Sequence, residues 1–344
     1  MEKVNLDWGN LPFGYMKTDF HLEYYYKDGK WSDAKVVEKD TIELSIAATS
    51  LHYGQEAFEG LKAYEHKDGS VSLFRPEENA RRLQKSAKKL IMVAPPEDLF
   101  LEAMEKIVQL NKRFIPPYGT GAALYIRPLL IGISGMLGVQ PSDEYLFLVF
   151  ASPVGPYFKE GLKPLKFKIE EKMKRAAPGG TGDVKVGGNY AASLRVSRAA
   201  RAEGFKEVIY TDAETNQYLD ESGPANFFAI SKDGKKYITP KSETILPSIT
   251  NKCLMYLAEN DLGLTVENRP VKVDEIYDFS EAGCCGTAAV ITPIESLSFR
   301  GETIVYANDG KVGPVSQRLY DRLTGMQVGD VEDKFGWNRK VKTD

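Results

Sequence analysis

The first half of the chain contains two stretches in which apolar residues return every three or four positions. One runs from Pro76 to Leu90 and the other from Phe100 to Phe114. This spacing gathers the apolar side chains on one face of an α-helix. Proline pairs follow each stretch, at 95–96 and 116–117, where a helix cannot readily continue. We therefore predict two amphipathic helices.

Three other segments of the first half have the character of strands. Residues 20–37 carry aromatic side chains around Asp28-Gly29, a turn signal, and predict a β-hairpin. Ala122–Gly132 and Tyr145–Val154 are almost continuously apolar and bounded by turn residues, which is typical of buried strands. The first half thus mixes helices and strands.

The second half is dominated by β signals. Two helices are expected to interrupt them, one from an N-cap at Ser248 to Gly263 and one over Val315–Leu323. The predicted strands, in which β-branched residues alternate or cluster, are Leu165–Glu170, Glu207–Thr211, Asn226–Ser231, Lys236–Thr239, Leu264–Val271 and Ala288–Leu297.

A domain boundary is expected in the Gly/Pro/Lys stretch between Pro156 and Pro164. We predict an α/β domain over residues 1–157, an interdomain linker over 158–170 and a β-rich domain over 171–344. The length of 344 residues agrees with about two domains of roughly 150 residues. The predicted fold class is therefore α/β followed by a β-rich second domain.

The charge balance narrows the class of partner. The chain has 45 basic and 48 acidic residues, a formal net charge of −3. It has no net positive field to collect nucleic acid or an anionic membrane surface. Small molecules or protein partners are expected, with no nucleic acid and no membrane.

Targeting and cysteine signals point to the cytoplasm. The N-terminus has no apolar signal core, and no apolar run approaches the roughly 20 residues of a spanning helix. The three cysteines, two of them adjacent at 284 and 285, suggest reduced thiols. They match no metal-binding spacing, so no metal site is expected.

The densest local anomaly is GGTGDVKVGGNY, residues 179–190, in which glycines surround Lys185. Glycines allow tight turns and the close approach of a bulky planar group. The segment fits neither a Walker A pattern nor a dinucleotide-binding fingerprint. On composition alone, a glycine-rich surface loop with a solvated lysine is the alternative, and Tyr190 would be a half-buried strand tyrosine.

A carboxylate further along the chain favours a cofactor over a plain loop. In YLDESGPANFF, Glu221 precedes a Gly-Pro turn and an asparagine that enters a predicted strand. A glycine-flanked lysine together with a carboxylate suggests pyridoxal 5′-phosphate (PLP). The lysine would form a Schiff base, and the acid would keep the pyridine nitrogen protonated.

At this point the chain resembles a known family, the class IV, fold-type IV PLP-dependent aminotransferases, and most closely the branched-chain amino acid aminotransferases. The resemblance covers nearly the whole chain. The matching segments, in the family's order, are LHYGQEAFEGLKAY (51–64), FRPEENARRL (74–83), LYIRPLLIG (124–132), SPVGPYF (152–158), GTGDVKVGGNY (180–190), ESGPANFF (221–228), ILPSITN (245–251) and CCGTAAVITP (284–293).

The resemblance implies a D-amino acid aminotransferase-like fold. Its N-terminal α/β domain would be the smaller one, and its C-terminal domain would be a larger pseudo-barrel that binds PLP. It also implies a homodimer.

The resemblance assigns the cofactor residues. Lys185 would be the Schiff-base lysine and, once released, the acid/base that moves the substrate's α-proton. A free lysine with a pKa of about 10.4 is a poor base near neutrality, so its site must lower that pKa. Glu221 would hold the proton on the pyridine nitrogen, and Tyr190 would hydrogen-bond the phenolic oxygen. The remaining cofactor contacts, the phosphate ligands among them, would be Arg82, Asn226, Ile249, Thr250 and Thr287.

Two of the phosphate assignments agree with the expected helices. By the resemblance, Arg82 would point inward from its helix while Arg81 faces elsewhere; without the resemblance, either arginine would be interpreted as part of a solvated face. Ile249 and Thr250 follow the Ser248 cap, where helix N-terminal amides bind phosphate well.

The substrate residues follow from the same resemblance. An aromatic wall suits an aliphatic side chain, whereas glutamate needs a polar group such as Arg127 or a tyrosine hydroxyl. Leu137 would reach the pocket of a second subunit. Besides Leu137, the implied substrate-binding residues are Tyr53, Phe58, Tyr125, Arg127, Tyr157, Ala288 and Ala289.

Two departures from the animal members stand out. Pro224 takes the place of a threonine and brings neither a hydroxyl nor a backbone donor. Cys284 and Cys285 lie upstream of the position of those members' Cys-x-x-Cys pair, so we predict no equivalent thiol switch.

The resemblance thus implies a PLP-dependent transaminase that moves the amino group of L-leucine, L-isoleucine or L-valine to 2-oxoglutarate by ping-pong kinetics. It would serve branched-chain amino acid biosynthesis or degradation. The alternatives are a D-amino acid aminotransferase or an aminodeoxychorismate lyase on the same scaffold, or a non-catalytic PLP-binding protein.

Overall fold

A computed structural model describes residues 2–158, 161–307 and 309–343. Its backbone contacts divide the chain into two compact units. The first unit comprises Met1–Lys159, Val184–Gly187 and Met326–Asp344, and the second comprises Glu160–Asp183 and Gly188–Gly325. Each unit is described by itself.

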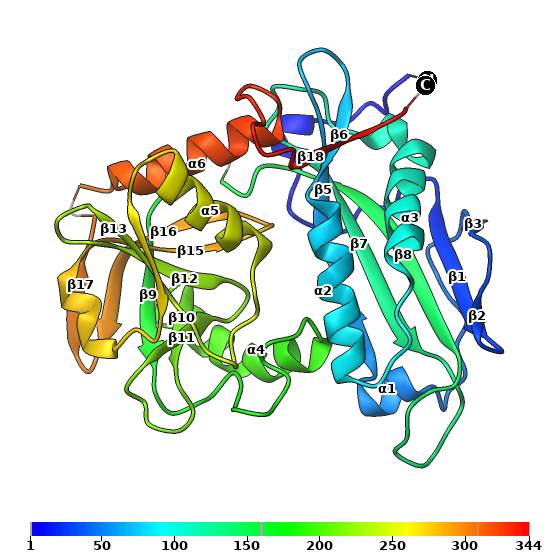
Figure 1. The fold of residues 1–344 in the computed structure, drawn as a ribbon, viewed down its shortest axis with the longest axis horizontal. Helices are drawn as coiled ribbons and strands as arrows, with labels where there is room; N and C mark the ends of the chain where they lie inside the picture. The colour runs from blue at the N-terminus through cyan, green and yellow to red at the C-terminus, as the bar shows by residue number, and fades with distance from the viewer. Residues whose placement is uncertain (1, 159–160, 308, 344) are drawn as a thin grey trace. The chain divides into compact units, whose positions relative to one another are not determined.

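The first unit is built on an antiparallel sheet with the strand order β18-β6-β5-β7-β8-β1-β2, to which β3 and β4 add at β1 and β7 (Figure 1). Its strands are β1 (His21–Lys27), β2 (Lys30–Trp31), β3 (Lys35–Val37), β4 (Glu56–Phe58), β5 (Leu61–Glu65), β6 (Val71–Phe74), β7 (Ala123–Gly132), β8 (Tyr145–Val154) and β18 (Asn338–Val341).

Two helices cover one face of this sheet (Figure 1). They are α2 (Pro76–Lys89) and α3 (Glu97–Leu110), and their apolar faces join the central strands in one buried cluster. The helical periodicity therefore predicted both helices correctly. The remaining helices of this unit are α1 (Thr49–Tyr53) and the 3-10 turns η1 (Trp8–Asn10) and η2 (Lys112–Phe114).

The second unit contains a mixed sheet with the order β11-β10-β9-β16-β15-β12-β13-β14, and β17 pairs with β16. β11 also contacts β12 and β13, so this sheet curls back on itself, as a pseudo-barrel requires. The strands are β9 (Leu165–Glu170), β10 (Glu207–Thr211), β11 (Leu219–Ser222), β12 (Asn226–Ser231), β13 (Lys236–Pro240), β14 (Thr265–Arg269), β15 (Phe279–Gly286), β16 (Val290–Phe299) and β17 (Glu302–Val305).

Three α-helices and one 3-10 helix accompany the second sheet: α4 (Gly187–Ala202), α5 (Ile249–Asn260), α6 (Pro314–Gln327) and η3 (Val273–Asp278). Val196 and Ala200 of α4 pack against Val208 and Tyr210 of β10. The segment GGNY therefore starts a helix, and the alternative of a strand tyrosine at Tyr190 is wrong.

The hairpin, the two apolar strands of the first half and the strands predicted for the second half are all present, with small shifts at their ends. The domain boundaries differ from the expectation in two places. Leu165–Glu170 of the expected linker forms β9, while residues 159 and 160 of that linker lie outside the described residues. β18 pairs with β6, which attaches the C-terminal segment to the first unit.

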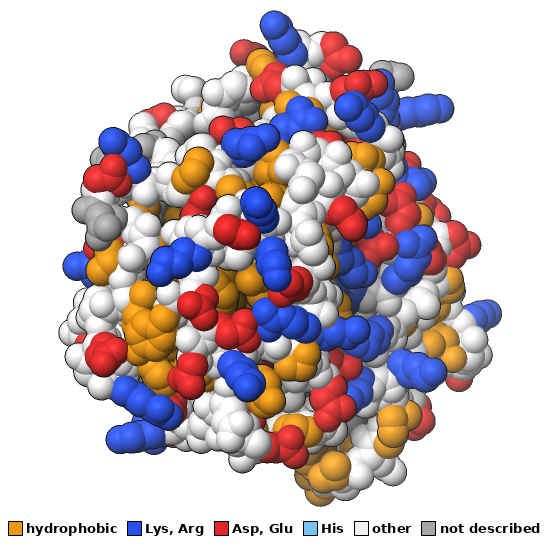
Figure 2. All heavy atoms as spheres, turned by 60° about the vertical axis from the view of Figure 1, so that its left-hand side comes forward, with side chains coloured by type: hydrophobic (Ala, Val, Ile, Leu, Met, Phe, Trp, Pro, Cys, Tyr) orange, Lys and Arg blue, Asp and Glu red, His pale blue; other side chains and the backbone are white. Residues whose placement is uncertain are grey.

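The surface carries both signs of charge. On the face drawn in Figure 2, basic and acidic side chains of the described residues are interspersed. Among the described residues, no helix combines the length and the apolar character needed to cross a bilayer.

Candidate active site

The backbone of Lys185 is fixed within the first unit from both sides. Its amide donates to the Ser86 hydroxyl on α2 at 2.9 Å, and its carbonyl accepts from the Phe58 amide on β4 at 3.1 Å. Val184 and Val186 on either side are buried in the core of this unit, which turns the intervening lysine the other way. Its Nζ lies 4.6 Å from the centroid of the Phe58 ring.

The glycine two residues after Lys185 has a packing reason. A Cβ at Gly187 would overlap the Glu56 carboxylate, which accepts a hydrogen bond from the Gly187 amide. Burial raises the pKa of Glu56. The short strand β4 therefore holds the lysine segment at both Lys185 and Gly187.

Arg82 points inward from α2, as predicted, whereas Arg81 does not. The Arg82 side chain is 10% exposed and the Arg81 side chain 60%. Arg82 donates from Nε and Nη2 to the two carboxylate oxygens of Glu59, at 2.8 and 2.7 Å. Asn79, one helical turn earlier, donates to the same carboxylate at 2.8 Å.

The predicted substrate residues Tyr125 and Arg127 share one face of β7, because they are two positions apart in a strand. Arg127 donates to the Tyr125 hydroxyl at 3.0 Å, and its guanidinium lies 4.9 Å from the centroid of the Phe58 ring. The buried Nε of Arg127 has no hydrogen-bond partner among the described residues. An acceptor brought by a ligand would satisfy it.

A cavity of about 260 Å³ contains both Tyr125 and Arg127. Phe13 also lines it and meets the Tyr125 ring edge-on at 5.4 Å and the Tyr157 ring at 6.4 Å between centroids. No sequence signal marked Phe13, since it stands in an irregular N-terminal segment.

Tyr53 and Leu137, which were also predicted, contact one another away from this cavity. The Tyr53 hydroxyl donates to the Leu137 carbonyl. Both side chains are exposed, that of Leu137 to 90%. They form a small outward-facing patch on the first unit.

Glu221 lies on β11 in the second unit and is buried. One carboxylate oxygen lies 2.9 Å from Nη2 of Arg175 in an ion pair and accepts from the Leu246 amide at 3.0 Å, and the other accepts from Asn226 at 2.6 Å. Burial raises the pKa of Glu221 to about 7, although Arg175 opposes the rise. The site therefore holds a carboxylate that needs cationic and hydrogen-bonding support to stay charged.

Arg175 is the functional residue of this unit that the sequence reasoning missed. It is buried, and it also donates to the carbonyl oxygen of Thr244. Its Nε has no hydrogen-bond partner among the described residues. An arginine in a loop carries no sequence signal of the carboxylate it will meet.

The predicted phosphate ligands of the second unit lie next to the Glu221 network. Ser248 caps α5 by accepting from the Asn251 amide at 3.2 Å, so Ile249 and Thr250 form the first turn, whose amides have no intrahelical acceptor. Asn226 links the two regions, because it donates both to Glu221 and to the Leu246 carbonyl two residues before the cap.

Thr287, Ala288 and Ala289 form the turn between β15 and β16. Asn226 pairs with Cys285, two residues before that turn, so the turn lies at the same end of β12 as Asn226. Tyr190 is half-buried on α4. The second unit thus gathers Glu221, Asn226, the start of α5 and this turn.

The three cysteines are free and buried. Burial raises the pKa of both Cys284 and Cys285. These thiols are therefore poor nucleophiles near neutral pH.

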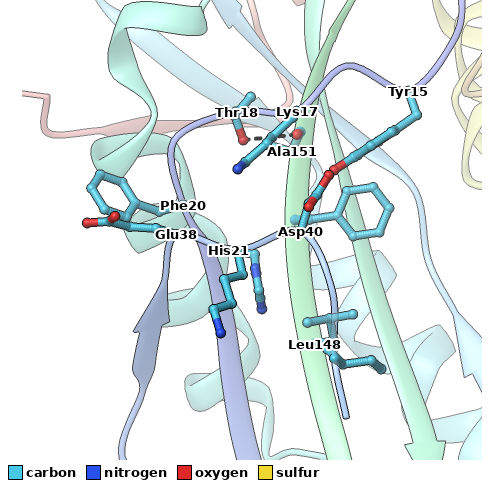
Figure 3. A pocket seen from close by; sticks show the side chains of 12 residues that line it. Tyr15, Lys17, Thr18, Phe20, His21, Glu38, Asp40, Leu148 and Ala151 are labelled. Atoms are coloured by element: carbon cyan, nitrogen blue, oxygen red, sulfur yellow. Dashed lines mark hydrogen bonds between the residues drawn. The ribbon is translucent and has the colours of Figure 1, made fainter.

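A second cavity of about 220 Å³ lies in the first unit near the start of β1 and contains none of the predicted site residues (Figure 3). Leu148, Phe150 and Ile42 supply apolar side chains to its lining, and Lys17 and Asp40 supply charge.

Known proteins resemble this chain over nearly its whole length. Residues 56–297 match the family model described as amino-transferase class IV. The chain is 49% identical over 343 residues to a branched-chain-amino-acid aminotransferase of Haemophilus influenzae, covering 98% of this chain and 99% of the relative. It is 47% identical over 335 residues to the enzyme of the same name from Helicobacter pylori, covering 97% of each.

Solved structures agree. The branched-chain amino acid aminotransferase of Escherichia coli superposes with a TM-score of 0.78 at 28% identity and covers 95% of this chain and 100% of its own. A second branched-chain amino acid aminotransferase, from T.th., was solved in complex with N-(5′-phosphopyridoxyl)-L-glutamate. It superposes with a TM-score of 0.80 at 26% identity, with the same coverage.

Proposed function

This chain belongs to the class IV aminotransferases, and from this premise we propose that it transfers the amino group of L-leucine, L-isoleucine or L-valine to 2-oxoglutarate with PLP as cofactor. The observation that carries the substrate class is the 49% identity over almost the full length of a branched-chain-amino-acid aminotransferase. Kinetics are ping-pong, because one site takes the amino donor and the amino acceptor in turn.

The residues present fit PLP. In the second unit, the buried carboxylate of Glu221 suits a protonated ring nitrogen and the first amides of α5 suit a phosphate; in the first unit, Arg82 suits a phosphate as well. When bound, PLP supplies a ring that accepts electrons from the substrate's α-carbon. The chain's own residues must hold that ring, keep it charged and move one proton.

Lys185 performs two tasks in this proposal. Its Nζ would hold the cofactor through the aldehyde carbon and, once free, would act as the acid/base that accepts and returns the substrate's α-proton. Its backbone is tied to Ser86 and Phe58, so the amine stays in place when it is displaced. The apolar face of Phe58 under Nζ disfavours access of bulk water to the ammonium.

Glu221 holds the proton on the ring nitrogen. To do so, it must be ionised although it is buried. The positive charge of Arg175, together with the hydrogen bonds donated by Asn226 and the Leu246 amide, favours the ionised form. Tyr190 hydrogen-bonds the ring's phenolic oxygen, and Arg82, Ile249, Thr250 and Thr287 bind the phosphate.

Substrate recognition uses apolar walls and one arginine. Phe58, Tyr125 and Tyr157 remove the aliphatic side chain from water, while the amides of Ala288 and Ala289 bind the α-carboxylate. For glutamate, the buried Nε of Arg127 has no hydrogen-bond partner among the described residues, and a side-chain carboxylate would accept from it. This explains how one pocket accepts both an aliphatic and an acidic side chain.

We also propose that the protein works as a homodimer in the cytoplasm. The exposed patch of Tyr53 and Leu137 supports the dimer, because it presents the two predicted substrate residues outward, to a second copy. Three free cysteines support a reducing compartment. Sedimentation should give twice the 38.3 kDa of the chain.

The alternatives on the same scaffold are not favoured, since the curated relatives are named branched-chain aminotransferases. A half-reaction titration separates them. The purified protein is mixed with L-leucine, L-isoleucine, L-valine, L-glutamate and D-alanine in turn, and the cofactor's visible absorbance is followed. The four L-amino acids should change it and D-alanine should not. Strong turnover of D-alanine with little turnover of L-leucine would contradict the proposal.

A further inference from the structure

Three consecutive residues, Phe58-Glu59-Gly60, join β4 to β5 in the first unit and contact three different parts of the candidate site. The Phe58 ring lies under the Lys185 amine. Gly60 leaves room for the Tyr125 hydroxyl, with which a Cβ at this position would overlap. Glu59, between them, faces Arg82.

Glu59 is fully buried and held from several directions. Its backbone amide donates to the Pro128 carbonyl on β7 at 2.8 Å. Its carboxylate accepts two hydrogen bonds from Arg82 and one from Asn79. A buried carboxylate is costly unless it is paired in this way.

We propose that Glu59 is a positioning residue for Arg82 that fixes the guanidinium in the orientation in which it binds the cofactor's phosphate. The inference rests on the proposed function, in which Arg82 is a phosphate ligand. The fork of two parallel bonds uses Nε and Nη2 and fixes the plane of the guanidinium. Asn79 in turn fixes the carboxylate that holds the fork.

The physical gain is preorganisation. An arginine side chain loses considerable rotamer entropy when a ligand immobilises it. A bidentate partner imposes that ordering during folding, so phosphate binding does not have to. Removal of an outer partner typically weakens the affinity of a ligand-holding residue by roughly 10- to 100-fold.

The same helix offers a matched control. Arg81 donates to Glu78 at 3.1 Å, but the Arg81 side chain is largely exposed. Glu78→Gln therefore removes the carboxylate that Arg81 and Arg75 contact on α2 and leaves the Glu59 carboxylate of the Arg82 pair in place.

The test compares two ligands of the apoprotein that differ only in the phosphate, namely PLP and pyridoxal. The affinity of each is measured by fluorescence titration for the wild type and for Glu59→Gln, Glu59→Asp, Arg82→Gln, the double variant Glu59→Gln/Arg82→Gln and Glu78→Gln. The ratio of the two dissociation constants reports the phosphate contacts alone. Circular dichroism confirms that each variant is folded.

Glu59→Gln should weaken PLP binding by roughly 10- to 100-fold and leave pyridoxal binding within about twofold. Glu59→Asp, which keeps the charge but shortens the side chain, should show a smaller loss of the same kind. The double variant should be no worse than Arg82→Gln, because Glu59 acts only through Arg82. Glu78→Gln should match the wild type.

An unchanged preference for PLP in folded Glu59→Gln or Glu59→Asp overturns the inference. Equal losses for PLP and pyridoxal also overturn it, because they indicate a general packing defect. If Arg82→Gln itself keeps the wild-type preference, the assignment of Arg82 as a phosphate ligand fails, which is a separate failure of the proposed function. If Glu59→Gln does not fold, Glu59→Asp decides.

Discussion

Each unit of the protein contains one buried arginine–glutamate pair at its candidate site, and the two pairs have opposite arrangements. In the first unit, Arg82 is assigned to the cofactor and Glu59 supports it. In the second, Glu221 is assigned to the cofactor and Arg175 supports it. In each pair, the residue assigned to the cofactor has the charge opposite to that of the group it would bind. A phosphate is anionic, and a protonated ring nitrogen is cationic.

The pairs also differ in how tightly they are held. Arg82 and Glu59 share two parallel hydrogen bonds, whereas Arg175 and Glu221 form an ion pair through Nη2, which donates its hydrogen bond to a backbone carbonyl. The Nε of Arg175 is unpartnered within the described residues. The second pair is therefore less completely satisfied, and its carboxylate has a pKa raised to about 7.

This difference shows why buried ion pairs are poor indicators of stability. Taking both charges out of water costs about as much as their attraction returns, and removal of one partner leaves an unpaired buried charge. Both pairs are better understood as devices that hold one charged group ready for a ligand. Experiments on each pair can test that interpretation.

The largest effect is expected from Arg175→Gln. Without the cation, the pKa of Glu221 should rise further above its value of about 7, so that less of the carboxylate is ionised near neutral pH. We expect kcat to fall by roughly 10- to 100-fold and the acid limb of its pH profile to move to higher pH.

Arg201→Gln is the matched control for Arg175→Gln. Arg201 pairs with buried Glu207 at 3.6 Å in the same unit, but the Arg201 side chain is 65% exposed. It should leave the profile unchanged. An Arg175→Gln enzyme with lower kcat but an unmoved pH profile would show that Arg175 has only a structural role.

Glu221→Gln should change how stability depends on pH. The folded-state pKa of Glu221 is raised from 4.5 to about 7, so folding favours its protonated form. Ionisation of Glu221 therefore lowers the free energy of unfolding. This loss of stability is absent below about pH 4.5 and complete above about pH 7, where it amounts to about 3 kcal/mol.

The glutamine variant lacks this dependence. The free energy of unfolding of both apoproteins is measured with urea. The value for the glutamine variant minus that for the wild type should therefore rise by up to about 3 kcal/mol as the pH increases from about 5 to about 8. A constant offset arises from unpaired Arg175 and does not affect the comparison. Parallel pH curves for the two proteins would contradict a raised pKa of Glu221.

A third arginine sharpens the contrast, because Arg127 donates to a tyrosine hydroxyl and lies over two aromatic rings, and its interaction with the Glu56 carboxylate is electrostatic only. It is therefore the one we expect to meet a substrate carboxylate. Arg127→Gln should lower kcat/KM for glutamate by roughly tenfold or more and that for leucine much less. Equal losses for the two amino acids, measured side by side, would count against this role.

The smallest effect is expected from thiol reagents. Cys284 lies close enough to Glu221 to interact with it electrostatically, but burial raises the pKa of the thiol. Iodoacetamide at about pH 8 should therefore leave activity within about twofold. Rapid inactivation that a substrate prevents would show that the thiols are accessible and that the neighbourhood of Glu221 is not closed.

The pattern of apolar residues was sufficient for the long elements, because α2 and α3 bury a periodic apolar face and β7 and β8 are almost continuously apolar. It failed for β4 and β5, which are short and flanked by Gly54 and Gly60. It also failed for α4, since two glycines at its start disfavour a helix. There, the contact of Gly187 with Glu56 and the packing of Val196 on β10 outweigh local propensity.

The site residues divide along a similar line. Lys185, Glu221 and Arg82 could be assigned because each belongs to a motif. Glu59 and Arg175 could not, because their significance lies in a partner distant in sequence. Glu59 and Arg82 are 23 residues apart, and only the antiparallel pairing of β4 with β7 and the packing of α2 bring them together.

The most direct test is to trap the bond between the protein and its cofactor. Holoenzyme is reduced with borohydride, digested and analysed by mass spectrometry, with protein treated first with L-leucine as the control. The pyridoxyl group should be found on Lys185 alone, and prior treatment with L-leucine should abolish it. Attachment at another lysine, or none at all in protein that still transfers amino groups, would contradict the assignment of Lys185 and the mechanism built on it.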